Sequence, residues 1–225
     1  MIVAGADGCP TGWVVCRRDE RGVLDIQVVK ALADICEGLS ILAVDMPFGL
    51  LDVPRRGGRD CEQAARKLLA GRASSVFPSP CRPALECGSY AEANAISKKL
   101  GIGLTQQMFN ILPKVREIDE LLRQRPGLRT ILHEAHPELA FARMNGGKPL
   151  PSKKRKPEGY ADRRRLLVAH GFPVEIDRLP GAARDDILDA VACCRTAQLI
   201  AEGKATCLGA TDVRDRHGLA MNIWF

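Results

Sequence analysis

Apolar runs separated by turn-forming residues dominate the first fifty positions of the chain. MIVAGAD is followed by the turn GCPTG, and WVVCRRD and GVLDIQVVK are joined by a turn around Gly22. These runs predict a meander of three antiparallel strands. ALADICEGL then predicts a short helix, and ILAV at 41–44 predicts a buried strand that ends at Asp45 and is stopped by Pro47.

The pattern becomes helical from about residue 54 to residue 125. RDCEQAARKLLAG, SYAEANAISKKLG and QQMFNILPKVREIDELLRQ predict three helices, and the Pro-rich loop SSVFPSPCRPA separates the first two. We expect 54–125 to form a helical insertion, or cap, on the sheet.

Beyond the insertion, apolar strands and helices resume. LRTILHE predicts a strand ending at Glu134, ELAFARMNG predicts a short helix, and a basic loop leads into a helix that ends near AHGF. A further helix begins in ARDDILDAV, and LAMNIWF predicts a final strand that lies either on a sheet edge or in a homodimer contact.

Three of the predicted strands end at or near an acidic residue. Asp7, Asp45 and Glu134 follow IVAGA, ILAV and TIL, respectively. If these strands are parallel neighbours, their carboxyl ends meet at one edge of the sheet, where open α/β sheets place their sites. Because neighbouring strands lie about 5 Å apart, Asp7 and Asp45 could share a cation.

The last long helix carries acidic residues on a face that its other residues mark as buried. An advance of about 100° per residue places Asp185, Asp186 and Asp189 roughly opposite Arg195, Gln198 and Glu202. Helix capping is the alternative explanation, since acids are favoured in a first turn that follows a Pro-Gly break. Capping explains Asp185 well but Asp189 poorly, because Asp189 lies a full turn inside the helix.

Carboxylates that converge without histidine or thiolate partners favour hard divalent cations, Mg²⁺ or Mn²⁺. Two such ions about 4 Å apart can stabilise the attacking and leaving oxygens of a phosphodiester displacement. The pattern therefore predicts a metal-dependent nuclease acting on DNA or RNA.

Charge and length are compatible with that prediction without requiring it. The 225 residues suit one medium-sized domain, and 33 basic against 27 acidic residues give a net charge of +6. Two groups of basic residues are candidates for nucleic-acid contacts. They are Lys153, Lys154, Arg155 and Lys156 in a basic loop, and Lys114 and Arg116 in the insertion. Solvated surface is the alternative for both, and an aromatic content of 4% disfavours base-specific reading of single strands.

Other classes of protein are disfavoured. No apolar run is long enough to span a bilayer, and the N-terminus lacks the features of a signal peptide, so we expect a cytoplasmic protein with no membrane partner. The nine cysteines include no Cys-x-x-Cys pair, which favours reduced core residues over disulfides or zinc ligands.

Several segments also match a known pattern: GADGCPTGWVV, AVDMPFGL, SSVFPSP, QQMFNILPKVREIDELL, EAHPELAF and RDDILDAV. Together they resemble a bacterial and archaeal family of unknown function, described as predicted RNase H-like nucleases, over nearly the whole chain. DILDAV also resembles the closing acidic pair of RuvC-type resolvases. The resemblance implies an α/β protein with one RNase H-like domain over 1–225, in which helices flank a mixed five-stranded sheet.

By position, the resemblance assigns metal binding and catalysis to four aspartates: Asp7, Asp45, Asp186 and Asp189. Glu134 and Glu138 compete for a further catalytic role, and His136 could position a water or the leaving group. RuvC-type enzymes have Glu where this chain has Asp45, which leaves open whether one or two ions bind.

Two other functions remain alternatives. A nucleotide-binding phosphotransferase or ATPase of related fold would share this strand order, although the chain has no Walker-type loop. A non-catalytic nucleic-acid-binding protein would use the basic loop and would not need the acidic residues.

Overall fold

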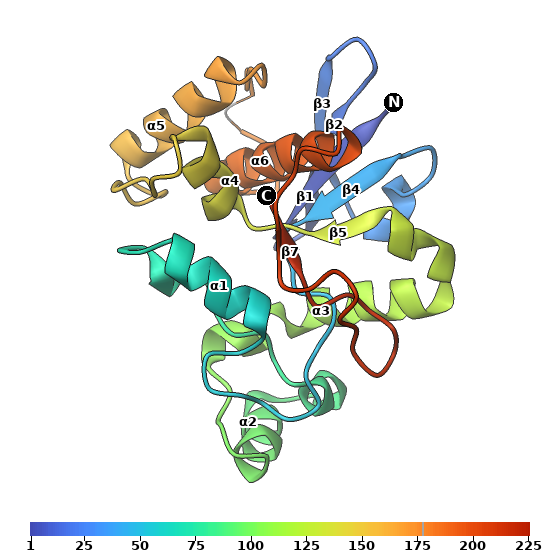
Figure 1. Cartoon of the computed structure of the whole chain (residues 1–225). Coiled ribbons are helices and arrows are strands. Elements are labelled where there is room, and N and C mark those ends of the chain that lie inside the picture. Colours follow the sequence, from blue (N-terminus) through green and yellow to red (C-terminus); the bar gives the residue numbers. More distant parts are fainter. Residues whose placement is uncertain (177) are drawn as a thin grey trace.

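The computed structural model describes residues 1–176 and 178–225, and its centre is a five-stranded sheet (Figure 1). The strands are β1 (Val3–Cys9), β2 (Gly12–Arg18), β3 (Leu24–Val29), β4 (Ile41–Val44) and β5 (Leu132–Glu134). Their order in the sheet is β3-β2-β1-β4-β5. β1, β2 and β3 are antiparallel neighbours, whereas β1, β4 and β5 run parallel. The predicted mixed five-stranded sheet is therefore confirmed.

Helices account for most of the remaining chain. The α-helices are α1 (Asp60–Leu68), α2 (Tyr90–Lys99), α3 (Gln106–Gln124), α4 (Pro137–Met144), α5 (Pro157–Ala169) and α6 (Arg184–Ala201). Four short 3₁₀ helices are η1 (Leu32–Ile35), η2 (Ala73–Ser75), η3 (Arg82–Glu86) and η4 (Pro126–Thr130). The short helix expected after β3 is thus a single 3₁₀ segment, and the strand expected from residue 128 begins at Leu132, after η4.

Alternating side chains of the sheet build two separate cores. Ala4 and Ala6 of β1 pack on the α3 side, with α3 residues such as Leu112 and Ile118. Val3 of β1 packs in the second core, on the α6 side. Because side chains alternate with a period of two along a strand, Asp7 lies on the α6 side, in phase with Val3.

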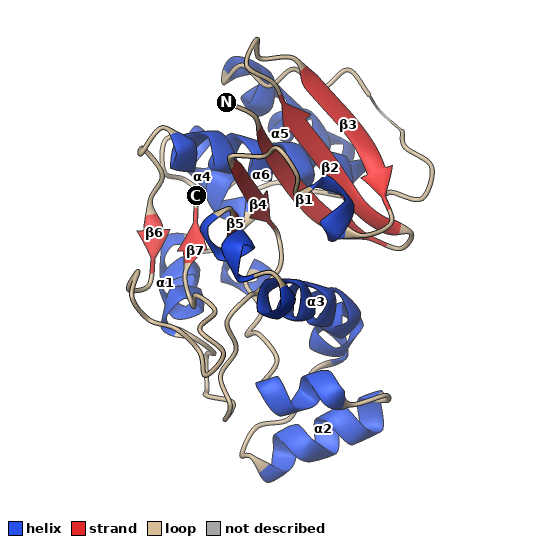
Figure 2. Cartoon of the chain, turned by 90° about the vertical axis from the view of Figure 1, so that its right-hand side faces the viewer, coloured by secondary structure: helices blue, strands red, loops and turns tan. Residues whose placement is uncertain are grey.

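The insertion contributes to the main layers of the fold. α3 covers one face of the sheet, whereas α2 lies farther from it, at the lower end of both views (Figures 1 and 2). A sheet with two apolar faces needs a helix on each, and α3 supplies one of them.

α6 lies very close to β1 because position 5 is glycine. A Cβ atom on Gly5 would lie 2.0 Å from the backbone nitrogen of Cys194 and 2.3 Å from the carbonyl oxygen of Ala190. Neither backbone atom can move without shifting the helix. The glycine in GADG therefore lets α6 approach β1 and sets the depth at which Asp189 meets Asp7.

The C-terminal strand lies at an edge, one of the two places expected for it. β7 (Ile223–Trp224) pairs with β6 (Cys207–Leu208) in a small antiparallel sheet, and Trp224 forms a parallel bridge to Ala135, just beyond β5.

Two sequence-based expectations concern the chain as a whole. All nine cysteines are free and eight of them are buried, as expected of reduced core residues. None of the helices in the described ranges combines the length and the hydropathy that crossing a bilayer requires.

Candidate metal centre

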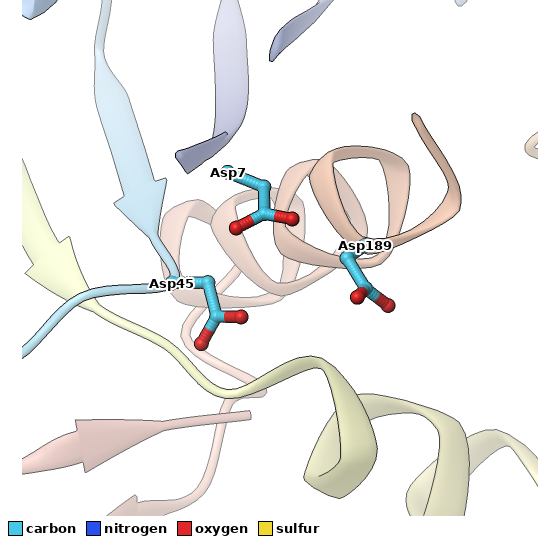
Figure 3. Close-up of side chains that lie close together, drawn as sticks. All are labelled: Asp7, Asp45 and Asp189. Carbon is cyan, nitrogen blue, oxygen red and sulfur yellow. The ribbon is translucent and has the colours of Figure 1, made fainter. Parts of the chain in front are cut away.

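Three carboxylates from distant parts of the chain converge beside the sheet. Asp7 lies near the end of β1, Asp45 follows β4, and Asp189 lies in the second turn of α6 (Figure 3). One oxygen from each can be chosen so that all three lie within 4.8 Å of one another. The register explains the first two: Ala6 pairs with Val44, so Asp7 and Asp45 are the next pair along neighbouring strands and share a face.

The environment of this acidic triad is costly for negative charge. Asp7 is 7% exposed and Asp189 is 2% exposed. Among residues 1–176 and 178–225, none donates a hydrogen bond to the carboxylate of Asp7 or Asp45. Burial, and then the charges of Asp45 and Asp189, raise the pKa of Asp7 well above its usual value. Burial also raises the pKa of Asp45, and that of Asp189 to about 6.

Glu134 does not join the triad, and strand register explains why. Val44 pairs with Glu134, so both side chains lie on the α3 side of the sheet, opposite Asp45. The residue in phase with Asp45 is Ala135, which packs in the core on the α6 side.

The Glu134 carboxylate instead binds a buried arginine. Arg59 donates through Nη1 and Nη2 to Glu134, at 2.8 and 2.5 Å, and through Nε to Glu62 at 2.8 Å. The Glu134 carboxylate also accepts the backbone N–H of Phe48 at 3.0 Å. Arg59 was not among the residues expected from the sequence, where it stands in the basic run PRRGGRD. The only local signal is Glu62 three residues later, which is common at helix starts.

The first turn of α6 divides its acidic residues between two roles. The expected cap, Asp185, does not cap the helix: its Oδ2 lies 3.4 Å from Lys154 Nζ and 3.5 Å from Arg155 Nε. Asp186 has the capping role, because its Oδ2 accepts the backbone N–H of Ala183 at 2.9 Å. Asp186 lines the same cleft as the triad without being one of its three members.

Lys154, unlike its basic neighbours in the loop, contacts the acidic triad. Its Nζ donates to Asp189 Oδ2 at 2.7 Å. Burial alone would lower the pKa of Lys154, but Asp189, through its charge and this hydrogen bond, raises it above the usual value. The side chains of Lys153, Arg155 and Lys156 remain exposed.

The two candidates in α3 are held by contacts within the chain. Lys114 Nζ lies 4.5 Å from the centre of the Trp13 ring and 3.6 Å from Glu117. Arg116 donates to the carbonyl oxygens of Leu85 and Cys87. These hydrogen bonds connect α3 to η3 and leave the Arg116 guanidinium committed to contacts within the chain.

The remaining candidates lie in the wall of the cleft. Glu138 Oε1 accepts from Arg163 at 2.5 Å, whereas its buried Oε2 has no hydrogen-bond partner among the described residues. His136 Nε2 lies 3.3 Å from the carbonyl oxygen of Ser75, and its buried Nδ1 has no partner within the same residues.

The acidic triad opens into a cleft of about 440 Å³. Besides the triad, the cleft lining includes the acidic residues Asp186 and Glu138 and the apolar residues Phe77 and Ile111. Arg72 and Lys154 supply cations, and Arg72 approaches Glu138 at 3.9 Å. A cavity of this volume is large enough for a nucleotide-sized ligand.

The triad fits a hard divalent ion. An octahedral Mg²⁺ with bonds of about 2.1 Å holds neighbouring oxygens about 3.0 Å apart and opposite oxygens about 4.2 Å apart. The three carboxylate oxygens lie within 4.8 Å of one another, so rotation of the side chains toward a shared centre would bring them to an ion. All three ligands are carboxylates, two of them without any donor in the described chain, which is the donor set that Mg²⁺ and Mn²⁺ prefer.

The raised pKa values predict how stability depends on pH when no divalent ion is present. In the unfolded chain these aspartates lose their protons near the ordinary pKa of 3.8, whereas in the folded chain they keep them to higher pH. The free energy of unfolding therefore falls as pH rises above 3.8, through about pH 6 and beyond. Asp7→Asn removes one of these buried acids. The variant should therefore gain stability over the wild type as pH rises, by about 1–3 kcal/mol at pH 8.

Urea unfolding in EDTA at pH 4, 6 and 8 measures this difference. In saturating Mn²⁺ at pH 8 the wild type should instead be more stable than Asp7→Asn, because the ion stabilises only the chain that retains Asp7. A difference between variant and wild type that is the same at all three pH values would contradict the predicted titration.

Comparison with curated proteins and with solved structures finds no match. A family model matches residues 5–214, which include every member of the acidic triad and Lys154. Because the match covers most of the chain, the protein belongs to the family described as Protein of unknown function (DUF429).

Proposed function

We propose that the protein is a divalent-metal-dependent nuclease that hydrolyses phosphodiester bonds of DNA or RNA. The supporting observation is the acidic triad, in which carboxylates from β1, the end of β4 and α6, two of them buried, converge without enough cations to balance them. Mg²⁺ or Mn²⁺ bound there would polarise a phosphoryl oxygen. The resemblance to predicted RNase H-like nucleases supports the same function.

Several side chains of the cleft have chemistry suited to a phosphodiester. Arg72 and Lys154 offer cationic donors to its oxygens. His136 also lines the cleft, where its ring can position a water or the leaving group.

Contacts outside the acidic triad favour a nucleic acid over a bare phosphate ester. Phe77 lines the cleft and is 47% exposed, so its ring can stack on an unpaired base. The exposed Lys153, Arg155 and Lys156 lie in the same loop as Lys154 and can follow the phosphate backbone. A cytoplasmic location belongs to this proposal and is supported by the nine free cysteines.

A cleavage assay tests the proposal. The protein is incubated with end-labelled single-stranded, double-stranded and branched DNA and RNA, in Mg²⁺, Mn²⁺, Ca²⁺ or EDTA. We expect cleavage of at least one substrate in Mg²⁺ or Mn²⁺ and none in EDTA.

The cleft volume also suits a mononucleotide, so ATP is included as a separate substrate. Turnover of ATP without cleavage of any polymer would favour the phosphotransferase or ATPase alternative. Metal-independent binding with a steep salt dependence and no cleavage would favour a non-catalytic binding protein.

A further inference from the structure

Lys154 occupies the position that a second cation would take in a two-ion site. Its ammonium group lies 2.7 Å from Asp189 Oδ2 and 3.4 Å from Asp185 Oδ2. In a two-ion site a carboxylate commonly bridges the ions, one oxygen on each. Asp189 has the matching arrangement, because Lys154 binds Oδ2 and no described residue donates to Oδ1.

The loop that carries Lys154 is held firmly in place. Arg163, which is 1% exposed, donates to the carbonyl oxygen of Ser152 at 3.2 Å, and the Ser152 hydroxyl donates to Asp162 at 2.9 Å. The backbone just before Lys154 also packs closely on α5, because a Cβ atom on Gly159 would lie 2.1 Å from the carbonyl oxygen of Lys153. The close packing of the loop on α5 therefore places Lys154, whose side chain is 37% exposed, against Asp189.

Charge balance indicates how many ions the site can hold. With the three carboxylates of the acidic triad ionised, their charges and that of Lys154 sum to two negative charges, which one divalent ion neutralises. Asp185, which also lies near the Lys154 ammonium, has Arg155 as a second cationic partner at 3.5 Å. A second divalent ion beside Asp189 would meet the lysine ammonium at close range and leave the site with excess positive charge. Asp7 and Asp45, which receive no hydrogen bond from the described chain, are the two carboxylates of the acidic triad that form no ion pair with Lys154.

We infer that this chain binds one divalent ion in the acidic triad and that Lys154 serves as a built-in second cation. The inference rests on the proposed function and specifies its cofactor as a single Mg²⁺ or Mn²⁺ between Asp7, Asp45 and Asp189. The Lys154 ammonium would remain on Asp189 Oδ2. In catalysis Lys154 would stay on Asp189 and face the phosphate oxygen that a second ion would otherwise contact.

Mn²⁺ titration tests the inference without any activity measurement. Isothermal titration calorimetry should give one Mn²⁺ per chain for the wild type. Lys154→Met removes the charge and keeps the length of the side chain, so this variant should bind a second Mn²⁺. Electron paramagnetic resonance should then show the broadened signal of two coupled ions, which the wild type lacks.

Two further variants complete the design. Lys153→Met changes the exposed neighbouring lysine and should keep one ion per chain. Lys154→Arg keeps the positive charge and should also bind one ion. If circular dichroism shows that Lys154→Met does not fold, Lys154→Gln, which also removes the charge, should bind two ions and keeps the test decisive.

The outcomes separate the inference from the proposed function. Two ions in the wild type, two ions in Lys154→Arg, or no additional ion in folded Lys154→Met would overturn the role of Lys154 while leaving a metal site in place. Absence of Mn²⁺ binding in every variant would overturn the metal site itself, and the proposed function with it.

Discussion

Asp7→Asn is expected to lower metal-dependent cleavage at least about 10³-fold while leaving the chain folded. A neutral amide is a much weaker ligand for a hard ion than a carboxylate is, and Asp7 has no other partner in the described chain. The substitution also removes a buried charge, so the loss cannot result from unfolding. Cleavage rates and Mn²⁺ affinity, measured on the same preparation, should fall together.

Two comparisons make the Asp7 result specific. Asp25→Asn changes an exposed aspartate on β3 of the same sheet and should cleave at the wild-type rate. Asp186→Asn should lose less activity than Asp189→Asn, because Asn also caps helices and Asp186 is not one of the three converging residues. Wild-type cleavage by both Asp7→Asn and Asp189→Asn would show that the site lies elsewhere.

Arg59→Met is expected to cost about 3–5 kcal/mol of stability, the largest structural effect we predict. Arg59 is 2% exposed and pairs with Glu62 and Glu134, which are 2% and 5% exposed. Methionine fills much of the same volume but leaves two carboxylates buried without their cation. Chemical denaturation at pH 7 measures the loss.

Arg56→Met serves as the matched control, since Arg56 is exposed and lies three residues earlier in the same basic run. It should change stability by less than about 0.5 kcal/mol. Adding Glu134→Gln to Arg59→Met should recover part of the loss, because one uncompensated charge is removed. A cost below about 1 kcal/mol for Arg59→Met alone would contradict a structural role for this ion pair.

The features that could be predicted from sequence are those that depend on local periodicity. The runs IVAGA and ILAV predict strands that each end at an acid. The structure makes these strands parallel neighbours, the condition under which both acids fall at the same edge of the sheet. Helical periodicity places Asp189 on the buried face of α6, and the structure brings it to within 4.8 Å of Asp7 and Asp45. Three of the six candidate acidic residues, Asp7, Asp45 and Asp189, therefore converge.

The features that could not be predicted depend on register and on long-range pairing. The register of β5 against β4 decides whether Glu134 or Ala135 faces the α6 side, because a shift of one residue exchanges the two faces. The run TIL does not reveal that register. Arg59 and Arg163 occur in basic runs that look solvated, but both are buried against carboxylates, Glu134 and Glu138. Lys154 is indistinguishable in sequence from Lys153, and only the packing of the loop on α5 turns one of them inward.

The most direct test of the central claim is an X-ray diffraction measurement from a crystal soaked in Mn²⁺, with data collected at the manganese absorption edge. We predict an anomalous peak within about 2.3 Å of one oxygen each of Asp7, Asp45 and Asp189. Bound manganese elsewhere, with no peak between these three carboxylates, would contradict a metal centre at this site.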